Sequence, residues 1–345
     1  MIFYAAFVPG LQECVAEAVK DRLPDAVIQK LLDGAIIFQT GCTYDKLNFF
    51  CFNNIFLVSD ILDGEFSPET HMKKIIAAHK NDPVISCNNK KIQSFRIICS
   101  MENKFVPVNE KIKQDTERFI AMQSGMTVNR SLPDTEFWFL YRNETGKPGE
   151  TSFSIFMKRL TKHASWEKSL RPGELPPPLA WMLCRLAGLK HSDTAADPFC
   201  GSGAIPLAAL KHFPVKKFIA CDNDPKAIAR TKNALQNCSK EKYDVYKTDI
   251  RSILSILEKD SIDAIITDPP WGMYKETEIP IELFYDEMMK IFKGLLKEDG
   301  IIVLLTAKVP ELQNAVKETE LAVKQVIPIL LSGKKTSIFI IKKEE

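Results

Sequence analysis

Between residues 194 and 306, short apolar runs alternate regularly with segments of helical periodicity. The runs have the length of buried strands, and the segments between them are long enough for the crossover helices that join parallel strands. A chain that alternates in this way folds as an α/β domain, with helices on both faces of a mainly parallel sheet. The expected strands are Thr194–Ala196, Lys217–Cys221, Tyr243–Tyr246, Ile262–Ile266 and Ile301–Thr306, and the expected helices are Ala204–His212, Pro225–Gln236, Ile250–Leu257 and Ile281–Leu296.

The pattern changes after residue 309, where the strand-like runs 321–330 and 336–341 are joined by Ser332-Gly333-Lys334-Lys335, a hairpin connection. An antiparallel hairpin at the end of a doubly wound sheet distinguishes class I methyltransferase domains from dinucleotide-binding Rossmann domains. Prolines 176–178 suit the first turn of a helix that opens this region. We therefore predict a Rossmann-like class I methyltransferase fold, with a seven-stranded sheet and a terminal antiparallel hairpin, over residues 175–345.

The first 150 residues have a different organisation, in which strand-like pieces and helical segments form small α+β units. A turn-rich segment at 143–149 closes this part of the chain. We expect a ferredoxin-like domain over residues 1–62, a second α+β domain over 63–150 and a basic linker over 151–174. The expected strands are Ile2–Val8, Ala35–Thr40, Ile55–Leu62, Phe95–Cys99 and Phe137–Tyr141, and the expected helices are Gly10–Leu23 and Lys111–Met122.

Positive charge gathers between residues 151 and 190, where lysine and arginine outnumber acidic residues and aromatic side chains are interleaved. Such a segment could follow the phosphate backbone of RNA, although a solvated linker with surface lysines fits the same charges equally well. The formal net charge of +2 does not decide between them, because a weakly basic total can hide a strongly basic face. The residues expected to contact RNA are Lys158, Arg159, Lys162 and Arg171.

The nine cysteines are scattered, form no CxxC pair and have no spacing to histidine that suits zinc. We interpret them as reduced thiols of an intracellular protein and expect no metal site. No apolar run approaches the ~18 residues of a membrane span, and the apolar N-terminal segment carries no basic leader. The expectation is a monomeric cytoplasmic protein that does not bind a membrane.

A glycine loop, Asp197-Pro198-Phe199-Cys200-Gly201-Ser202-Gly203, lies at the end of the first expected strand of the α/β domain. Glycines at a strand-to-helix turn let the backbone approach a ligand closely, and ligands of doubly wound sheets bind at the carboxyl ends of the strands. The loop lacks the third glycine of a dinucleotide fingerprint and the Gly-Lys-Ser/Thr of a phosphate loop. It therefore favours a small-molecule cofactor over a dinucleotide, although tight turns also need glycine.

Two further acidic positions follow expected strands. Asp222 comes about 20 residues after the glycine loop, where a carboxylate can accept hydrogen bonds from both ribose hydroxyls of a cofactor. Asp224 followed by Pro225 is better explained as a helix N-cap and first helical residue. Asp249 could accept from an adenine amino group while Ile250 lies against the ring, or it could equally be a helix cap.

The fourth expected strand leads into Asp268-Pro269-Pro270-Trp271. Two prolines fix the backbone and remove two N–H donors, which leaves a rigid cluster of acceptors, and the adjacent tryptophan offers a face for stacking an unpaired base. The exocyclic amine of guanine or adenine is a poor nucleophile. The Asp268 carboxylate and Pro269 carbonyl could hold it in line with a methyl donor and stabilise the developing positive charge. The predicted catalytic residues are Asp268, Pro269, Pro270 and Trp271.

The tetrapeptide at 268–271 resembles the (D/N)PP(Y/F/W) motif of amino-methyltransferases, in which the glycine loop also comes first. Residues 127–138, with their Pro-Asp turn before a final strand, resemble part of a THUMP domain. Residues 1–60, through their segments 7–13 and 53–58, resemble the ferredoxin-like piece that accompanies THUMP in tRNA guanine-N2 methyltransferases. Residues 171–177 match the segment before the catalytic domain of that family.

This resemblance implies S-adenosyl-L-methionine (AdoMet) as cofactor and tRNA as partner, with a THUMP module over residues 63–150 that captures the 3′ end of tRNA. The implied product is N2-methylguanosine in the acceptor-stem region. The residues expected at the cofactor are Pro177, Asp197, Phe199, Gly201, Ser202, Gly203, Asp222, Asn223, Asp249, Ile250 and Asp268.

Two other functions fit the same residues. One is methylation of guanine N2 in ribosomal RNA or of adenine N6 in a nucleic acid, because an aspartate at position 268 accepts protons from either amine. The other is RNA binding without catalysis, which would leave Asp268 without a purpose.

Overall fold

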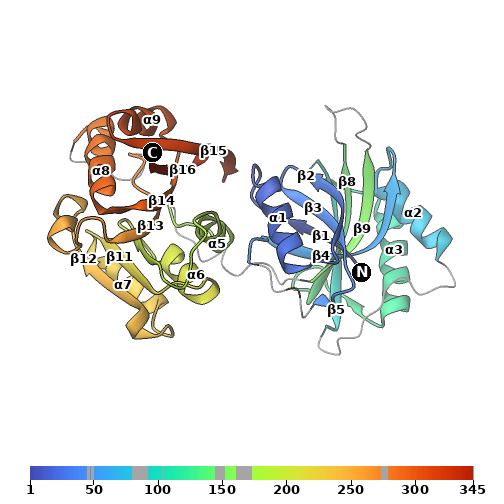
Figure 1. Cartoon of the computed structure of the whole chain (residues 1–345). Coiled ribbons are helices and arrows are strands. Elements are labelled where there is room, and N and C mark those ends of the chain that lie inside the picture. Colours follow the sequence, from blue (N-terminus) through green and yellow to red (C-terminus); the bar gives the residue numbers. More distant parts are fainter. Residues whose placement is uncertain are drawn as a thin grey trace. The chain divides into compact units, whose positions relative to one another are not determined.

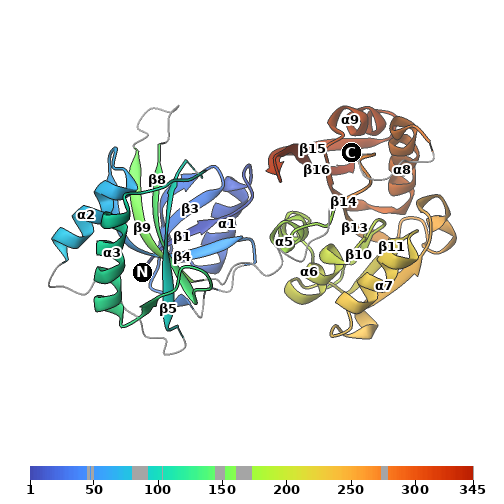
Figure 2. The ribbon, with the colours of Figure 1, turned by 180° about the vertical axis from the view of Figure 1, so that it is seen from behind.

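The computed structural model describes residues 1–44, 47, 50–79, 92–102, 104–143, 152–160, 173–272 and 279–344. The chain divides into two compact units, which Figures 1 and 2 show from opposite sides. The first unit comprises residues 1–6, 16–48 and 52–165, and the second comprises residues 7–15, 49–51 and 166–345.

The first 160 residues build one mixed sheet, in the order β2-β3-β1-β4-β9-β8-β5-β6, with β7 beside β5. Helices α2 and α3 pack on one of its faces (Figure 1) through a cluster of buried side chains that includes Ile75, Ile120 and Phe137. The strands are β1 (Ile2–Ala6), β2 (Val27–Leu32), β3 (Ala35–Gln39), β4 (Asn54–Asp63), β5 (Ser94–Met101), β6 (Lys104–Phe105), β7 (Thr127–Val128), β8 (Thr135–Arg142) and β9 (Phe153–Arg159), and the helices are α1 (Gln12–Arg22), α2 (Pro68–Ala78) and α3 (Glu110–Ser124).

Strands β4 and β9 connect the two regions that the sequence predicts as separate domains, because β4 pairs with β1 and with β9, and β9 pairs with β8. The sheet is therefore continuous across the predicted boundary at residue 62. Pairing is antiparallel except between β5 and its neighbours β7 and β8. The division into ferredoxin-like and THUMP domains stays a prediction.

Strand β9 corrects the prediction of a basic linker that begins at residue 151. It lies between β4 and β8, and every one of its side chains is buried. Lys158 and Arg159 are only 7% and 5% exposed, and Arg159 Nη1 donates to Glu136 Oε2 at 2.9 Å. Because a phosphate contact needs an exposed cation, these positions argue against the predicted RNA contacts of both residues. The other two predicted contacts, Lys162 and Arg171, lie outside the described residues.

Glu136 holds this part of the sheet together by accepting from three donors. The Trp138 indole and the Arg159 guanidinium each lie 2.9 Å from its Oε2, and Arg96 Nε lies 2.9 Å from its Oε1. Burial raises the pKa of the Glu136 carboxyl, but these hydrogen bonds outweigh it and hold the pKa below its ordinary value. The basic side chain of Arg159 therefore neutralises a buried acid.

The second unit contains the predicted doubly wound sheet. Its seven strands lie in the order β12-β11-β10-β13-β14-β16-β15, parallel from β12 to β14, with β16 antiparallel to both of its neighbours. The fold class and the terminal hairpin are thus confirmed. The strands are β10 (Thr194–Asp197), β11 (Lys217–Asp222), β12 (Tyr243–Lys247), β13 (Ile262–Thr267), β14 (Leu296–Thr306), β15 (Leu321–Leu331) and β16 (Lys334–Lys343).

Helices lie on both faces of this sheet (Figure 2). The segment expected as a helix from residue 250 forms a short 3-10 helix instead, and α9 was not expected from the sequence. The helices are α5 (Pro177–Leu186), α6 (Ala204–His212), α7 (Pro225–Ala234), α8 (Ile281–Leu295) and α9 (Val309–Lys317), with 3-10 helices η2 (Lys240–Lys242) and η3 (Ile250–Ser255).

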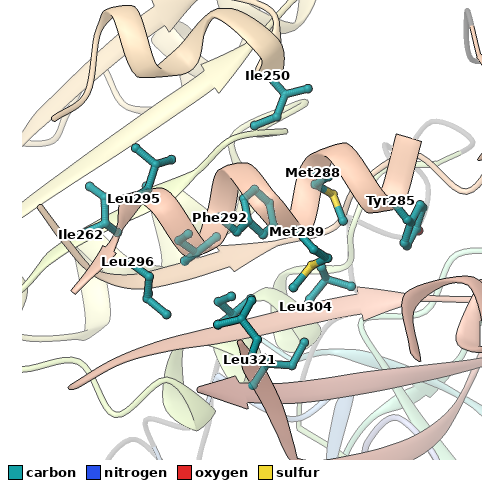
Figure 3. Close-up of a cluster of buried hydrophobic side chains, with 14 of the residues drawn as sticks. Ile250, Ile262, Tyr285, Met288, Met289, Phe292, Leu295, Leu296, Leu304 and Leu321 are labelled. Carbon is teal, nitrogen blue, oxygen red and sulfur yellow. The ribbon is translucent and has the colours of Figure 1, made fainter. Parts of the chain in front are cut away.

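Helix α8 is held against the sheet by apolar residues at helical spacing. Tyr285, Met288, Met289 and Phe292 have no exposed surface, and Figure 3 shows them in one cluster with Leu304 of β14. Burying each such side chain contributes about 1.5–3 kcal/mol. The first turns of α8 are thereby fixed beside the end of β13. In the described part of the chain, no helix is long and apolar enough to cross a membrane.

Candidate active site

The predicted functional segments meet at the carboxyl edge of the second sheet. Strand β10 pairs in parallel with β11 on one side and β13 on the other, with Asp197 opposite Ala220 and Ala196 opposite Ile265. The glycine loop, the residues after β11 and the Asp268–Trp271 tetrapeptide therefore leave adjacent strands in the same direction. This edge is the usual ligand site of doubly wound sheets.

The glycine loop has a conformation that requires glycine. Gly203, the N-cap of α6, has a φ of +87°, and a Cβ there would lie 3.0 Å from the Cα of Thr231 in α7. The Thr231 hydroxyl donates to the carbonyl of Gly201 at 3.2 Å, and the Cys200 N–H donates to the Cys221 carbonyl at 2.8 Å. The loop is thus held between β10 and β11, with its backbone close to the strand ends.

Asp222 joins the glycine loop to the end of β11. Its two carboxylate oxygens accept from the backbone N–H groups of Gly201 at 3.0 Å and of Asp224 at 2.9 Å. Each oxygen has a second lone pair, so the carboxylate can also accept from hydroxyls of a ligand. Asp224 accepts from the Lys226 N–H as N-cap of α7, and Pro225 is the first residue of that helix, which confirms the capping interpretation.

Asp249 and Ile250 lie where the chain leaves β12. The Asp249 carboxylate caps η3 by accepting from the Arg251 N–H at 2.9 Å. Ile250 is 5% exposed and packs in the core beside α8, which leaves little surface for an adenine ring. The structure shows the helix cap, and the predicted contact of Asp249 with an adenine amino group stays a prediction.

The remaining predicted cofactor residues flank this edge. Pro177 is the exposed first residue of α5, and Asn223 is exposed directly after β11. Ser202 is partly exposed between the two glycines. The Phe199 ring packs against the Phe284 ring of α8, with centroids 5.8 Å apart. The glycine loop therefore contacts the helix that follows the tetrapeptide.

The tetrapeptide begins with a buried, unpartnered acceptor. Asp268 keeps some solvent exposure as a residue, but its Oδ1 is inaccessible and has no hydrogen-bond partner among the described residues. The Trp271 indole N–H is also buried and has no hydrogen-bond partner among the described residues. It lies close enough to the Asp268 carboxyl to favour its charged form, although the two groups do not reach hydrogen-bond geometry. Burial, reinforced by the nearby Asp197, raises the Asp268 pKa well above its ordinary value.

Asp197 is the second buried carboxyl of the site. It accepts from the Thr267 hydroxyl at 2.7 Å and from the Phe199 N–H at 3.1 Å. Burial raises its pKa to about 7, although these two hydrogen bonds act in the opposite direction. Thr267 precedes Asp268 directly, so Asp197 also anchors the start of the tetrapeptide. Two neighbouring carboxyls in a buried site titrate as a coupled pair.

The raised pKa of Asp197 predicts a pH-dependent contribution to stability. The folded pKa of about 7 exceeds the ordinary 3.8, so this contribution is fully present below pH 3.8 and is lost as the pH rises through 7. The limiting slope is about 1.4 kcal/mol per pH unit for one group. Asp197→Asn keeps an acceptor for Thr267 but cannot ionise. We expect the free energy of unfolding of Asp197→Asn, relative to the unmodified protein, to increase between pH 5 and pH 8.

Urea unfolding at the two pH values, followed by circular dichroism, measures this difference. An equal difference at pH 5 and pH 8 would show that Asp197 keeps an ordinary pKa in the folded protein.

Sequence reasoning missed Tyr285, which contacts the tetrapeptide, and Thr306, which contacts Tyr285. The Tyr285 hydroxyl of α8 donates to the Pro270 carbonyl at 3.3 Å and lies 2.8 Å from the Thr306 hydroxyl at the end of β14. Neither residue stands in a recognisable motif, because Tyr285 is one apolar position of an amphipathic helix. Only the packing of α8 brings them together. Among the described residues, no group of histidine, cysteine and acidic side chains could hold a metal ion.

Comparison with known proteins agrees with this geometry. Residues 165–336 match the model of the UPF0020 family, described as an RMKL-like methyltransferase domain. The chain is 31% identical over 210 residues to a tRNA (guanine(10)-N2)-dimethyltransferase of Methanothermobacter thermautotrophicus, which covers 60% of this chain and 58% of that protein. It is 28% identical over 131 residues to the human U6 snRNA (guanine-N(2))-methyltransferase THUMPD2, covering 38% of this chain and 25% of that protein.

The crystal structure of TrmN from Thermus thermophilus has the same overall fold. It superposes with a TM-score of 0.82 over 99% of both chains, at 20% sequence identity. The chain spans 58% and 25% of the lengths of the two curated relatives. The family match, the doubly wound sheet and the glycine loop together assign the C-terminal half of the chain to the UPF0020 family of RMKL-like methyltransferase domains.

Proposed function

We propose that this protein transfers a methyl group from AdoMet to the exocyclic N2 of a guanosine in tRNA. The observation that carries the proposal is the Asp268 Oδ1, which is buried at the carboxyl edge of a methyltransferase domain and has no hydrogen-bond partner within the described parts of the chain. A buried acceptor without a donor costs about 1–3 kcal/mol. An exocyclic amine, which offers two N–H donors, would satisfy it.

The residues at the edge fit AdoMet as cofactor. The backbone of Gly201 and Gly203 leaves room for close approach, and Asp222 retains acceptor lone pairs for the ribose hydroxyls. Asn223 and Pro177 are exposed beside them. When bound, this cofactor supplies an electrophilic methyl group.

Asp268 would act as both positioner and electrostatic stabiliser. In the structure burial favours its neutral form, but a cation beside it, such as the sulfonium of AdoMet, favours the carboxylate. The carboxylate and the Pro269 carbonyl can then accept both amine hydrogens and turn the nitrogen lone pair out of conjugation with the ring. As the nitrogen gains positive charge, both hydrogen bonds strengthen, which lowers the barrier. Asp268 can also take the proton that the methylated amine releases.

The choice of guanine and of tRNA is supported by the relatives. Both curated relatives carry guanine-N2 activity in their names, and the first acts on tRNA. The human relative has THUMPD2 as part of its name, which agrees with the predicted THUMP module over residues 63–150. The acceptor-stem region of the tRNA stays the expected position of the methylated guanosine.

Incubating the purified chain with labelled AdoMet and three substrates tests the substrate class. The substrates are tRNA from cells lacking the gene, ribosomal RNA from the same cells, and duplex DNA. We expect incorporation into tRNA only. Incorporation into ribosomal RNA or DNA alone would assign a different substrate to the same chemistry, and no incorporation into any of them would contradict the proposed activity.

A further inference from the structure

A chain of three hydrogen bonds runs from the start of α9 to the tetrapeptide. The Lys308 N–H donates to the Thr306 hydroxyl at 2.8 Å, the Thr306 hydroxyl lies 2.8 Å from the Tyr285 hydroxyl, and Tyr285 donates to the Pro270 carbonyl at 3.3 Å. Thr306 and Tyr285 have no exposed surface. Water therefore does not compete for the hydrogen bond between these two hydroxyls, whereas the bonds to Pro270 and from Lys308 are partly buried.

The protons in this chain have one consistent arrangement. Tyr285 has a single hydroxyl proton, and the Pro270 carbonyl can only accept, so that proton points to Pro270. The Thr306 hydroxyl proton must then point to the Tyr285 oxygen, while the Thr306 oxygen accepts from the Lys308 N–H. Every donor has one acceptor. The direction of the Tyr285 O–H bond is thus set by Thr306.

The Pro270 carbonyl controls the direction in which the chain continues. The proline rings fix φ at positions 269 and 270, and neither residue has an N–H that could anchor the backbone. The soft torsion that remains before Trp271 is ψ of Pro270. The carbonyl of Pro270 lies in the same rigid peptide plane as the nitrogen of Trp271. A hydrogen bond to this carbonyl therefore fixes that torsion and, with it, the position of the Trp271 backbone nitrogen.

The two ends of the tetrapeptide are held by different elements. Thr267, directly before it, donates to Asp197 of β10, whereas Pro270 is held by Tyr285 of α8. The indole N–H of Trp271 is buried without a partner among the described residues and lies near the Asp268 carboxylate. A shift of the Pro270 carbonyl would move the indole relative to the carboxylate.

We propose that Tyr285, oriented by Thr306, is a positioning residue that fixes Trp271 against Asp268 and thereby sets the reactive geometry of the site. This inference rests on the proposed methyl transfer. Tyr285 does not touch the reacting atoms and acts through Pro270 and Trp271. Its loss should slow the chemical step without changing how tightly the cofactor or the tRNA is bound.

Tyr285→Phe tests this inference, because it removes only the hydroxyl. We expect kcat for tRNA methylation to fall roughly tenfold, with the affinities for S-adenosylhomocysteine and tRNA unchanged within about twofold, because small displacements in an active site are costly. Thr306→Val should reproduce the loss, Thr306→Ser should restore most of the rate, and the double variant Tyr285→Phe/Thr306→Val should be no slower than either single variant. Tyr243→Phe is the matched control, because it also removes one tyrosine hydroxyl. Tyr243 is the first residue of β12, at the amino end of that strand and away from the carboxyl edge, so this variant should keep the full rate.

A second readout does not depend on turnover. The four tryptophans can be labelled with 5-fluorotryptophan, and Trp271→Phe assigns the ¹⁹F signal of Trp271. Tyr285→Phe should shift or broaden that signal and leave the other three in place. A folded Tyr285→Phe protein with the full rate and an unchanged Trp271 signal would overturn the inference. If the unmodified protein methylates no RNA, the proposed function fails first, and the ¹⁹F spectra alone then decide whether Tyr285 positions Trp271.

Discussion

Asp268→Ala is expected to lower kcat for tRNA methylation by about three orders of magnitude or more. The alanine removes the buried oxygen that would accept from the exocyclic amine and the charge that would stabilise the transition state. Asp268→Asn keeps an acceptor oxygen without the charge, so its rate should fall between those of the alanine variant and the unmodified protein. Single-turnover kinetics with saturating AdoMet and tRNA measures the chemical step in all three proteins.

Binding and stability measurements distinguish this effect from misfolding. Asp268→Ala should bind S-adenosylhomocysteine and tRNA nearly as tightly as the unmodified protein. It should not be less stable at pH 8, because it removes a carboxyl whose ionisation in the buried site is unfavourable. Asp299→Ala is the matched control, since Asp299 is exposed in the irregular first part of β14, at the amino end of that strand and away from the carboxyl edge of the sheet. A rate for Asp268→Ala within threefold of the unmodified protein would exclude Asp268 from catalysis.

The second large effect is expected at Gly203. An alanine there must adopt a φ of +87° and place its Cβ 3.0 Å from the backbone of Thr231, which cannot yield without moving α7. We expect Gly203→Ala to lower the free energy of unfolding by about 2–4 kcal/mol, as strain and overpacking add. The loop should also lose most of its affinity for S-adenosylhomocysteine, because the loop backbone shifts.

Gly188→Ala is the matched control for the backbone conformation. Gly188 also has a positive φ, +61°, but a Cβ there would meet no atom within 4 Å. The control should lower the free energy of unfolding by only about 1 kcal/mol and leave ligand affinity unchanged. Urea unfolding and titration calorimetry give both quantities. Equal destabilisation by the two substitutions would show that contact with Thr231 does not matter.

The parallel sheet could be predicted because its strands are short, apolar and regularly spaced. Each expected strand from residue 194 onward matches an observed one, and Asp224 and Pro225 cap α7 as the sequence indicates. The glycine loop, Asp222 and the tetrapeptide could be placed together for a related reason. The carboxyl ends of adjacent parallel strands meet at one edge, so the order of the segments along the chain determines their neighbours.

Strand β9 shows why charge is a poor guide to exposure. The sequence at residues 153–159 has four apolar residues and Ser154 before it ends in Lys158-Arg159, and these two charges predict the start of a basic linker. The structure buries Arg159 because Glu136 of the neighbouring strand neutralises it. This partner lies 23 residues away in the sequence. Only the pairing of β8 with β9 places the two charges together.

Helix α2 and the Tyr285 contacts could not be predicted for different reasons. The start of α2 has an ordinary cap, in which Ser67 accepts from the Thr70 N–H, but its apolar positions are few and one of its buried residues is His71. Tyr285 lies in a helix whose position was predicted correctly, yet its hydroxyl reaches Pro270 only through the packing of α8 on the sheet. Local patterns predict elements; they do not predict which side chain of an element completes a site.

The most direct test of the account is the identity of the methylated nucleoside. Transfer RNA methylated by the purified protein is digested to nucleosides and separated by liquid chromatography with mass detection, alongside synthetic standards. We predict N2-methylguanosine, which is absent when Asp268→Ala replaces the unmodified protein. Recovery of N6-methyladenosine instead would contradict the proposal that guanine is the methylated base. N2-methylguanosine formed equally well by Asp268→Ala would contradict the proposed role of Asp268.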